Sequence, residues 1–197
     1  MVKFKVFFRT TALITVMLFS IFIWYGYTLD SKQRVEAAVP SLPDFEHESN
    51  QMFLDHVKQC VEYIHFYNDI NRVNLELLVA QAALESGWGT SRFAREGKNL
   101  FGIRTYDLRQ PHMLPWKDKP KKWGVKVYQH ECDSVLDYIK TLNNHSAYEN
   151  YRRLLKDGID DPFILVETLD AYASDQNYFV KIKSILNKIR GEYEINN

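Results

Sequence analysis

The sequence lacks an excess of either charge. Its 197 residues contain 25 lysines and arginines and 25 aspartates and glutamates, so the net charge is zero. A protein that binds nucleic acid through its phosphates usually gathers a basic excess on one face. The composition therefore argues against nucleic acid as a partner.

The sequence also lacks the short motifs of metal and nucleotide chemistry. Its six histidines form no His-Glu-x-x-His pair, and no glycine-rich phosphate-binding loop is present. The run 130–132 holds a histidine and a cysteine, but neighbouring residues point to different sides of a chain. We therefore expect no metal, no nucleotide and no other cofactor.

Cysteine is scarce, with Cys60 and Cys132 as the two examples. Neither lies in a recognisable nucleophile motif. An even pair permits one disulfide bond in an oxidising compartment. Cys60, however, falls on an apolar helical stripe, and a free cysteine commonly packs as a small hydrophobic residue. We therefore expect two buried thiols in preference to a disulfide.

An uncharged, apolar run is present at residues 11–27, after a segment with three basic residues and no acidic one. Its length of about 17 residues is at the lower limit for a helix that spans a bilayer. Its end carries aromatic residues, which are suited to the membrane–water interface. The basic start favours an inner-membrane anchor with the domain facing the periplasm or cell exterior. A cleaved signal peptide is the alternative, but the small residues of a cleavage site do not follow directly.

The sequence divides into three predicted parts. Residues 1–28 form the anchor or signal segment, and residues 29–48, with Pro40 and Pro43 and no clear periodicity, form a linker. Residues 49–192 remain for one domain with its own core.

Apolar residues recur at three- and four-residue steps through most of this domain, as in Phe53, Val57, Cys60 and Ile64, which predicts amphipathic helices. The stretch 99–130 differs, because prolines and β-favouring aromatic and branched residues dominate it. We expect a mostly helical α+β fold with a small β-lobe or hairpin inserted between helices.

One predicted helix ends with a single acidic residue in its last turn. Asn74 can cap its start, and Gly87 can supply the left-handed residue that ends it. The negative end of the helix dipole disfavours an ionised Glu85, and burial against Leu84 and Trp88 would raise its pKa further. A carboxylic acid that stays protonated near neutral pH is what cleavage of a glycosidic bond requires.

Three blocks of sequence extend this pattern: ESGWGTS at 85–91, NLFGI at 99–103 and YASDQNY at 172–178. In this order they resemble the bacterial glucosaminidase family that cuts peptidoglycan, and within it the Bax-type proteins. The resemblance covers about residues 51–189. It implies a lysozyme-like fold, a peptidoglycan glycan strand as substrate, and Glu85 as the general acid.

The resemblance also implies roles for residues outside the acid. Tyr172 would border the active site, with its hydroxyl bonded to the substrate's N-acetyl group, to the acid or to the attacking water. A core tyrosine with a satisfied hydroxyl is the alternative. The candidates for substrate binding are Asn99 and Phe101 from the second block, and Trp88 and Tyr106, whose aromatic rings could stack on sugars but could equally be buried.

A second catalytic carboxylate is harder to assign. The candidates are Asp107, Asp118 and Glu131, of which we favour Asp118, although its lysine-rich surroundings also fit a solvated turn. No glutamate lies between Glu96 and Glu131, so the family's β-lobe glutamate is absent. Attack by the substrate's own N-acetyl group is an alternative that needs one protein acid.

These observations predict a peptidoglycan hydrolase of the endo-β-N-acetylglucosaminidase type that cleaves a β-1,4 bond next to N-acetylglucosamine. Two alternatives remain open. A lytic transglycosylase would use the same acid but would close a 1,6-anhydro ring, and a non-catalytic peptidoglycan-binding or scaffold module would release no fragments.

Overall fold

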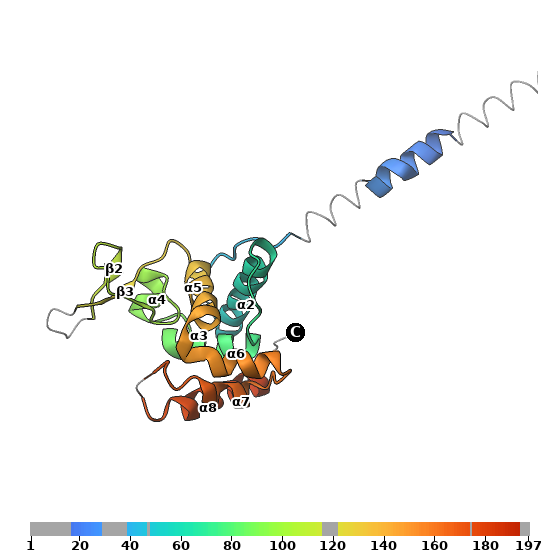
Figure 1. The fold of residues 1–197 in the computed structure, drawn as a ribbon. Helices are drawn as coiled ribbons and strands as arrows, with labels where there is room; N and C mark the ends of the chain where they lie inside the picture. The colour runs from blue at the N-terminus through green and yellow to red at the C-terminus, as the bar shows by residue number, and fades with distance from the viewer. Residues whose placement is uncertain (1–16, 29–38, 47, 116–121, 174, 194–197) are drawn as a thin grey trace, which may run out of the picture. The chain divides into compact units, whose positions relative to one another are not determined.

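The chain forms two compact units, Met1–Pro40 and Ser41–Asn197. The computed structural model describes most of the second unit and part of the first (Figure 1). The described residues are 17–28, 39–46, 48–115, 122–173 and 175–193.

The described part of the first unit contains one helix, at residues 17–28. This helix overlaps the predicted anchor run 11–27, of which residues 11–16 lie outside the described part. Among the residues that the structure describes, no helix has the length and apolar character needed to cross a membrane. The predicted transmembrane helix is therefore not found in this part of the chain.

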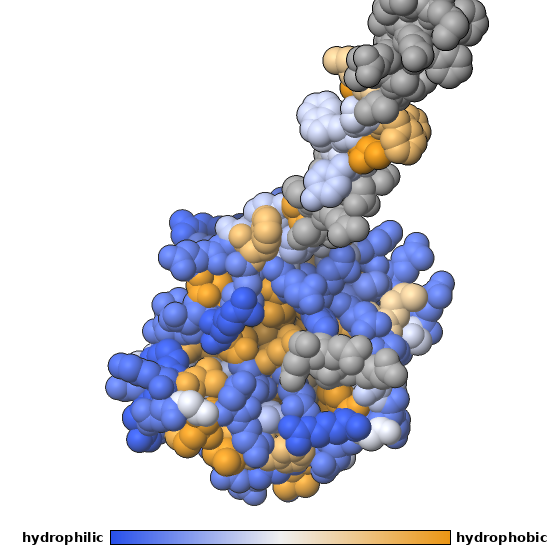
Figure 2. Space-filling model, turned by 90° about the vertical axis from the view of Figure 1, so that its right-hand side faces the viewer, coloured by the Kyte–Doolittle hydropathy of each residue, from blue (hydrophilic) through white to orange (hydrophobic). Residues whose placement is uncertain are grey.

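The second unit is mostly helical, which confirms the predicted α+β class. Its surface in Figure 2 is mainly hydrophilic, with apolar side chains in smaller areas. The described helices are α2 (Asn50–Tyr67), α3 (Leu75–Ser86), α4 (Arg92–Gly97), α5 (Glu131–Asn144), α6 (Glu149–Lys156), α7 (Pro162–Leu165) and α8 (Tyr178–Glu192), with 3-10 turns at Ser146–Tyr148 and Val166–Thr168.

A small antiparallel sheet lies between α4 and α5 in the sequence, as predicted for the β-lobe. It contains β1 (Arg104–Thr105), β2 (His112–Met113) and β3 (Gly124–Lys126) in the order β1-β3-β2. A Cβ atom added at Gly124 would lie 2.4 Å from the His112 ring, so β2 and β3 approach closely because this position is glycine. The lobe lies beside α4 (Figure 1).

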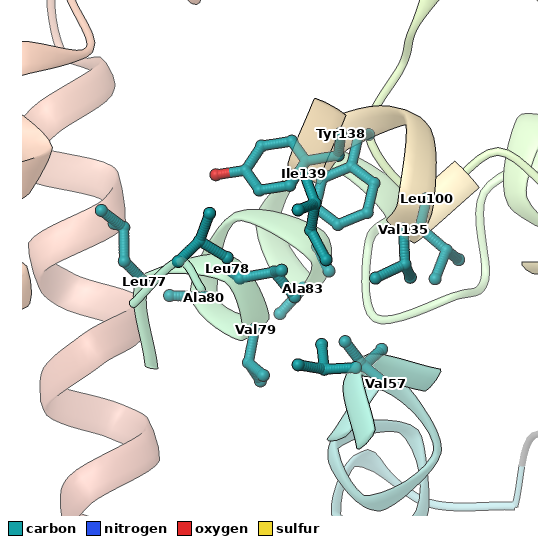
Figure 3. Close-up of a cluster of buried hydrophobic side chains, with 14 of the residues drawn as sticks. Val57, Leu77, Leu78, Val79, Ala80, Ala83, Leu100, Val135, Tyr138 and Ile139 are labelled. Carbon is teal, nitrogen blue, oxygen red and sulfur yellow. The ribbon is translucent and has the colours of Figure 1, made fainter. Parts of the chain in front are cut away.

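Helix α3 lies in the centre of the core. It packs against α8 and α2, and α2 packs in turn against α5. Figure 3 shows Leu78 and Val79 of α3 between Val57 of α2 and Ile139 of α5. Because α3 is surrounded by other elements, it is apolar on nearly all sides, as expected of a buried helix.

The ends of α3 confirm the predicted boundaries. The side chain of Asn74 accepts a hydrogen bond of 2.7 Å from the Leu77 amide, and Gly87 takes a left-handed conformation with φ of 59°. Glu85 is therefore placed in the last turn. The apolar residues predicted to recur along α2, from Phe53 to Ile64, are also buried, as the sequence indicated.

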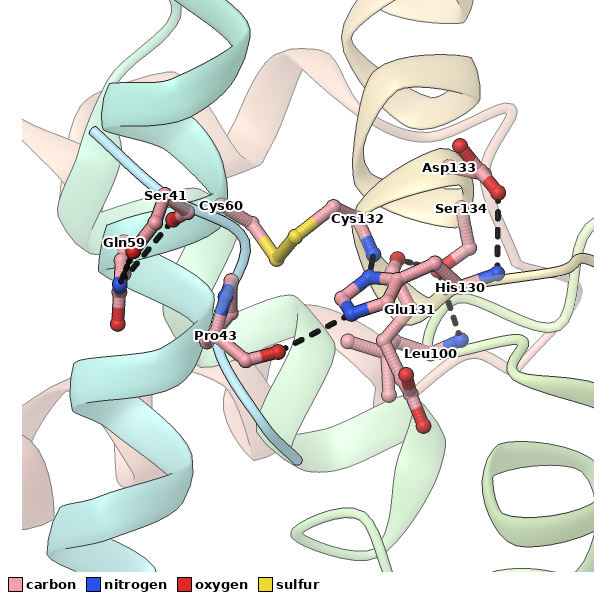
Figure 4. The surroundings of a disulfide bond; sticks show 10 residues. All are labelled: Ser41, Pro43, Gln59, Cys60, Leu100, His130, Glu131, Cys132, Asp133 and Ser134. Carbon is pink, nitrogen blue, oxygen red and sulfur yellow. Dashed lines mark hydrogen bonds between the residues drawn. A yellow bond between two sulfur atoms is a disulfide. The ribbon is translucent and has the colours of Figure 1, made fainter. Parts of the chain in front are cut away.

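The two cysteines form a disulfide bond, which corrects the prediction of two free thiols (Figure 4). Cys60 of α2 and Cys132 of α5 are both buried, and their Cα atoms lie 5.0 Å apart. The sequence predicted the burial of Cys60. Because the two cysteines are 72 residues apart in sequence, their distance in space could not be predicted from the sequence.

The end of the predicted linker packs beside this disulfide. His130 donates from its ring nitrogen Nε2 to the carbonyl oxygen of Pro43 at 3.0 Å, and the Gln59 amide donates to the carbonyl of Ser41 at 3.1 Å (Figure 4). The His130 ring also accepts from the Cys132 amide and so caps α5. Residues 41–45 thus belong to the surface of the second unit.

Candidate active site

Glu85 lies at a cavity of about 510 Å³. The lining comes from five segments: the end of α3, residues 101–104 at the start of the β-lobe, α5, the 3-10 turn at Ser146–Tyr148, and the loop before α8. The three sequence blocks of the resemblance thus converge, because Glu85, Phe101 and Tyr172 all line this one space.

The surroundings of Glu85 raise the pKa of its carboxyl above the ordinary value. Burial is the main cause, since it disfavours the charged form. A hydrogen bond from the Tyr178 hydroxyl and the positive charges of Arg104 and Lys181 act in the opposite direction and only partly offset it. The side chain is thus a carboxylic acid that keeps its proton at a higher pH than a solvated glutamate does.

Stacked aromatic rings form the apolar wall of the cavity. Phe101 stacks on Tyr138 with ring centroids 4.2 Å apart, and Tyr172 packs edge-on against Tyr138 and stacks on Tyr178 at 5.7 Å. The Tyr172 hydroxyl donates a hydrogen bond of 3.0 Å to the carbonyl of Phe101. Tyr172 therefore lines the cavity of Glu85, and its hydroxyl proton bonds the neighbouring loop.

Asn99 is buried and holds the loop that faces Glu85. Its amide donates to the carbonyls of Ile103 and Lys126 at 3.0 and 2.9 Å, and its oxygen accepts from the amides of Phe101 and Ile103. All its polar atoms are thus used within the protein, so the structure places Asn99 as a support of the cavity wall.

Gly102 follows in this loop and has a φ of 64°, which favours glycine. A Cβ atom built there would lie 3.9 Å from Glu85 Oε2. The backbone at Gly102 therefore approaches the acid closely.

Two of the three candidate second acids, Asp107 and Glu131, lie away from the cavity of Glu85. Asp107 is bound by Arg109, which lowers the pKa of the Asp107 carboxyl, and the buried Glu131 pairs with Lys98 at 2.8 Å. Neither residue lines the cavity, and Asp118 lies outside the described residues.

Asp175, from the third sequence block, lines the cavity instead. Its carboxylate forms an ion pair with Lys181, and this bond holds the pKa of Asp175 below its usual range. The described cavity wall thus contains two carboxyl groups whose pKa values are shifted in opposite directions, upward for Glu85 and downward for Asp175.

Trp88 and Tyr106 also lie away from the cavity wall. Trp88 has a left-handed φ of 58°, and its ring packs between Phe53 and Tyr193 with centroid distances of 6.3 and 5.6 Å. The Tyr106 side chain is 74% exposed. The apolar wall that the sequence assigned to Trp88 is supplied by Phe101, Tyr138 and Tyr172.

The sequence did not predict the roles of Gln81, Arg104 and Tyr178 around Glu85. Gln81 was visible as a polar residue one turn before the acid in an apolar helix, and Tyr178 as the last residue of the third block. Arg104 carried no signal, because its position depends on how the β-lobe packs.

The chain is similar in sequence to a known family of enzymes. Residues 62–191 match the family model described as mannosyl-glycoprotein endo-beta-N-acetylglucosaminidase. The chain therefore belongs to this glucosaminidase family.

Particular relatives support this assignment. The chain is 34% identical to Protein bax of Escherichia coli over 84 residues, which are 43% of this chain and 29% of the relative. It is 32% identical to the peptidoglycan hydrolase FlgJ of Vibrio parahaemolyticus over 59% of this chain and 41% of that protein. The chain thus spans less than half the length of either.

A solved structure shows the same fold. The catalytic domain of the autolysin Auto from Listeria monocytogenes aligns with a TM-score of 0.54 and 25% identity. The alignment covers 82% of this chain and 93% of the autolysin domain.

Proposed function

We propose that the domain hydrolyses peptidoglycan by cleaving a β-1,4 bond next to N-acetylglucosamine. The observation that carries this proposal is the position of Glu85, a carboxylic acid with a raised pKa on the wall of an open cavity. Membership of the glucosaminidase family and the similarity to a peptidoglycan hydrolase support the same substrate.

In the proposed reaction, Glu85 donates its proton to the glycosidic oxygen as the bond to the leaving sugar breaks. Positive charge develops at the anomeric carbon in an oxocarbenium-like transition state, and a water molecule then completes the hydrolysis. The Glu85 carboxylate that remains recovers a proton from this water. The cavity wall excludes bulk solvent from the acid on its aromatic side.

The second group in this reaction is proposed to be the substrate's own N-acetyl oxygen. Asp107 and Glu131 are occupied by cations elsewhere, and Asp175 is held by Lys181. An intramolecular nucleophile requires one protein acid, and the described cavity wall supplies that acid. The lysozyme-like placement of an extended glycan, between the helices and the β-lobe, belongs to the same proposal.

We also propose that the domain works outside the cytoplasm. The support is the buried disulfide between Cys60 and Cys132, since such bonds persist in oxidising compartments. Anchoring through residues 11–27 stays a prediction.

The products of digestion test the proposed function. The full-length protein is incubated with purified peptidoglycan, and the released fragments are identified by mass spectrometry. We expect fragments with reducing N-acetylglucosamine ends. Anhydromuramic ends would identify a lytic transglycosylase, and a folded protein that co-sediments with the glycan but releases nothing would identify a binding module.

The activity should depend on pH through the raised pKa of Glu85. A general acid is active while protonated, so the rate is expected to fall as the pH rises through that pKa. The measurement is the initial rate of reducing-end release from pH 4 to pH 9, with circular dichroism at each pH to confirm folding. A rate that increases steadily through this range would contradict the assignment.

Tyr172→Phe is expected to lower the rate about tenfold at most, the limit set by the loss of one hydrogen bond of about 1 kcal/mol. The substitution removes the hydrogen bond to the Phe101 carbonyl, which holds the loop before α8 against the loop that faces Glu85. Tyr151→Phe is the matched control, because the buried Tyr151 hydroxyl bonds the Asn74 amide outside the cavity. Equal rates for the two variants would show that the hydroxyl of Tyr172 has no special role.

A further inference from the structure

Gln81 is a buried polar residue of α3 and lies one helical turn before Glu85. It is fully buried, with no exposed surface. Its amide nitrogen donates a hydrogen bond of 2.7 Å to the hydroxyl of Tyr178, and its amide oxygen accepts one from the hydroxyl of Tyr138. One side chain thus joins α3, α5 and α8 behind the cavity.

A buried amide is costly unless both of its ends are bonded, and an apolar residue would suit the rest of α3 better. Gln81 meets this requirement through two tyrosines from separate helices. The arrangement is therefore specific, and its geometry determines where each hydroxyl proton points.

The proton positions follow from counting donors and acceptors. Tyr138 has one hydroxyl proton, and it goes to the oxygen of Gln81, so the nitrogen of the amide must face Tyr178. The Tyr178 oxygen then accepts this N–H, and its own proton is left to bond another acceptor. That acceptor is the carboxyl of Glu85.

We propose that Gln81 is a positioning residue for the catalytic acid: through Tyr178 it directs a hydroxyl proton at Glu85 and fixes the carboxyl at the cavity. This inference rests on the proposed function for its meaning in catalysis. Gln81 itself does not line the cavity and acts through another side chain.

Loss of the hydrogen bond from Tyr178 is expected to raise the pKa of Glu85. A hydroxyl that donates to a carboxyl favours its ionised form, and this bond lowers the pKa of Glu85 against the effect of burial. Without Gln81, the Tyr178 hydroxyl can turn toward the unpaired hydroxyl of Tyr138. Glu85 would then lose both its donor and its fixed orientation.

The test compares Gln81→Met, Tyr178→Phe and the double variant in the full-length protein, with soluble uncross-linked peptidoglycan strands as the substrate. Gln81→Met is expected to lower kcat about tenfold, to leave KM within about twofold, and to move the basic limb of the pH profile to higher pH. The double variant should match Tyr178→Phe, because residues that act through one another are not additive. Additive effects, or an unmoved basic limb, would overturn the proposal.

Two further variants separate positioning from stability. Tyr151→Phe removes the hydroxyl of another buried tyrosine, outside the cavity, and should leave the pH profile unchanged. If Gln81→Met does not fold, Tyr138→Phe replaces it, since the loss of the Tyr138 proton removes what orients the amide. It should move the basic limb in the same direction by a smaller amount.

A titration of the Glu85 carboxyl by ¹³C NMR tests the link between Gln81 and Glu85 without an activity assay. A pKa that rises in Gln81→Met and Tyr178→Phe, in a protein that does not cleave peptidoglycan, would support the link and reject the proposed function. If the protein is active and the pKa of Glu85 is equal in wild type and Gln81→Met, the link from Gln81 to Glu85 is rejected and the proposed function is retained.

Discussion

Glu85→Gln is expected to lower the rate of peptidoglycan hydrolysis by about 10²–10⁴-fold. The amide has nearly the same shape and can still accept the hydrogen bond from Tyr178, but its N–H groups are too weakly acidic to transfer a proton to the leaving oxygen. The measurement is the rate of reducing-end release at the optimum pH. A rate of Glu85→Gln above one tenth of the wild-type rate would contradict the role of Glu85 as the acid.

Glu131→Gln is the matched control. Glu131 is buried and pairs with Lys98, but it does not line the cavity. Its substitution is expected to reduce stability and to retain the rate at a temperature where the protein is folded. A loss as large as that of Glu85→Gln would instead make Glu131 a second catalytic group.

Stability gives Glu85→Gln an independent signature. Because the folded-state pKa of Glu85 is raised above the unfolded value, the folded protein binds the proton more tightly, and stability falls as the pH rises between the two values. Glutamine has no such dependence. The free energy of unfolding of the variant minus that of wild type should therefore be larger at pH 8 than at pH 4. Urea denaturation of both proteins at both pH values measures this difference.

Replacing both cysteines by serine is expected to lower the free energy of unfolding by about 2–4 kcal/mol. The disulfide links α2 to α5 across a sequence separation of 72 residues, so its loss releases a large loop in the unfolded chain. Urea denaturation of wild type, of wild type with reductant and of the double variant measures the effect. Wild type that is reduced should match the variant.

Activity separates this effect from catalysis. Neither cysteine lines the cavity, so the double variant should keep most of the wild-type rate at low temperature. Identical denaturation midpoints for the oxidised and reduced protein would contradict a stabilising disulfide.

The sequence was sufficient to predict the local structure around the acid. The cap at Asn74, the left-handed Gly87 and the apolar faces of α3 depend on neighbouring residues, and the structure confirms them. The β-lobe was predictable for the same reason, since its prolines and β-favouring residues are confined to one stretch.

Tertiary placement was not predictable from these patterns. Trp88 follows Glu85 closely in sequence, but the left-handed backbone at Trp88 directs its ring to Phe53 and Tyr193. Asn99 belongs to a recognisable block, yet a block does not distinguish a residue that binds substrate from one that holds the loop. The disulfide likewise required a distance that the sequence does not contain.

Titration of the Glu85 carboxyl by ¹³C NMR in the wild-type protein, with Glu85→Gln to assign the signal, measures the pKa of the proposed acid. We expect a pKa above that of a solvated glutamate, because burial at the cavity outweighs the nearby donors. A pKa at or below the ordinary value would contradict the claim that this fold keeps Glu85 protonated as a general acid.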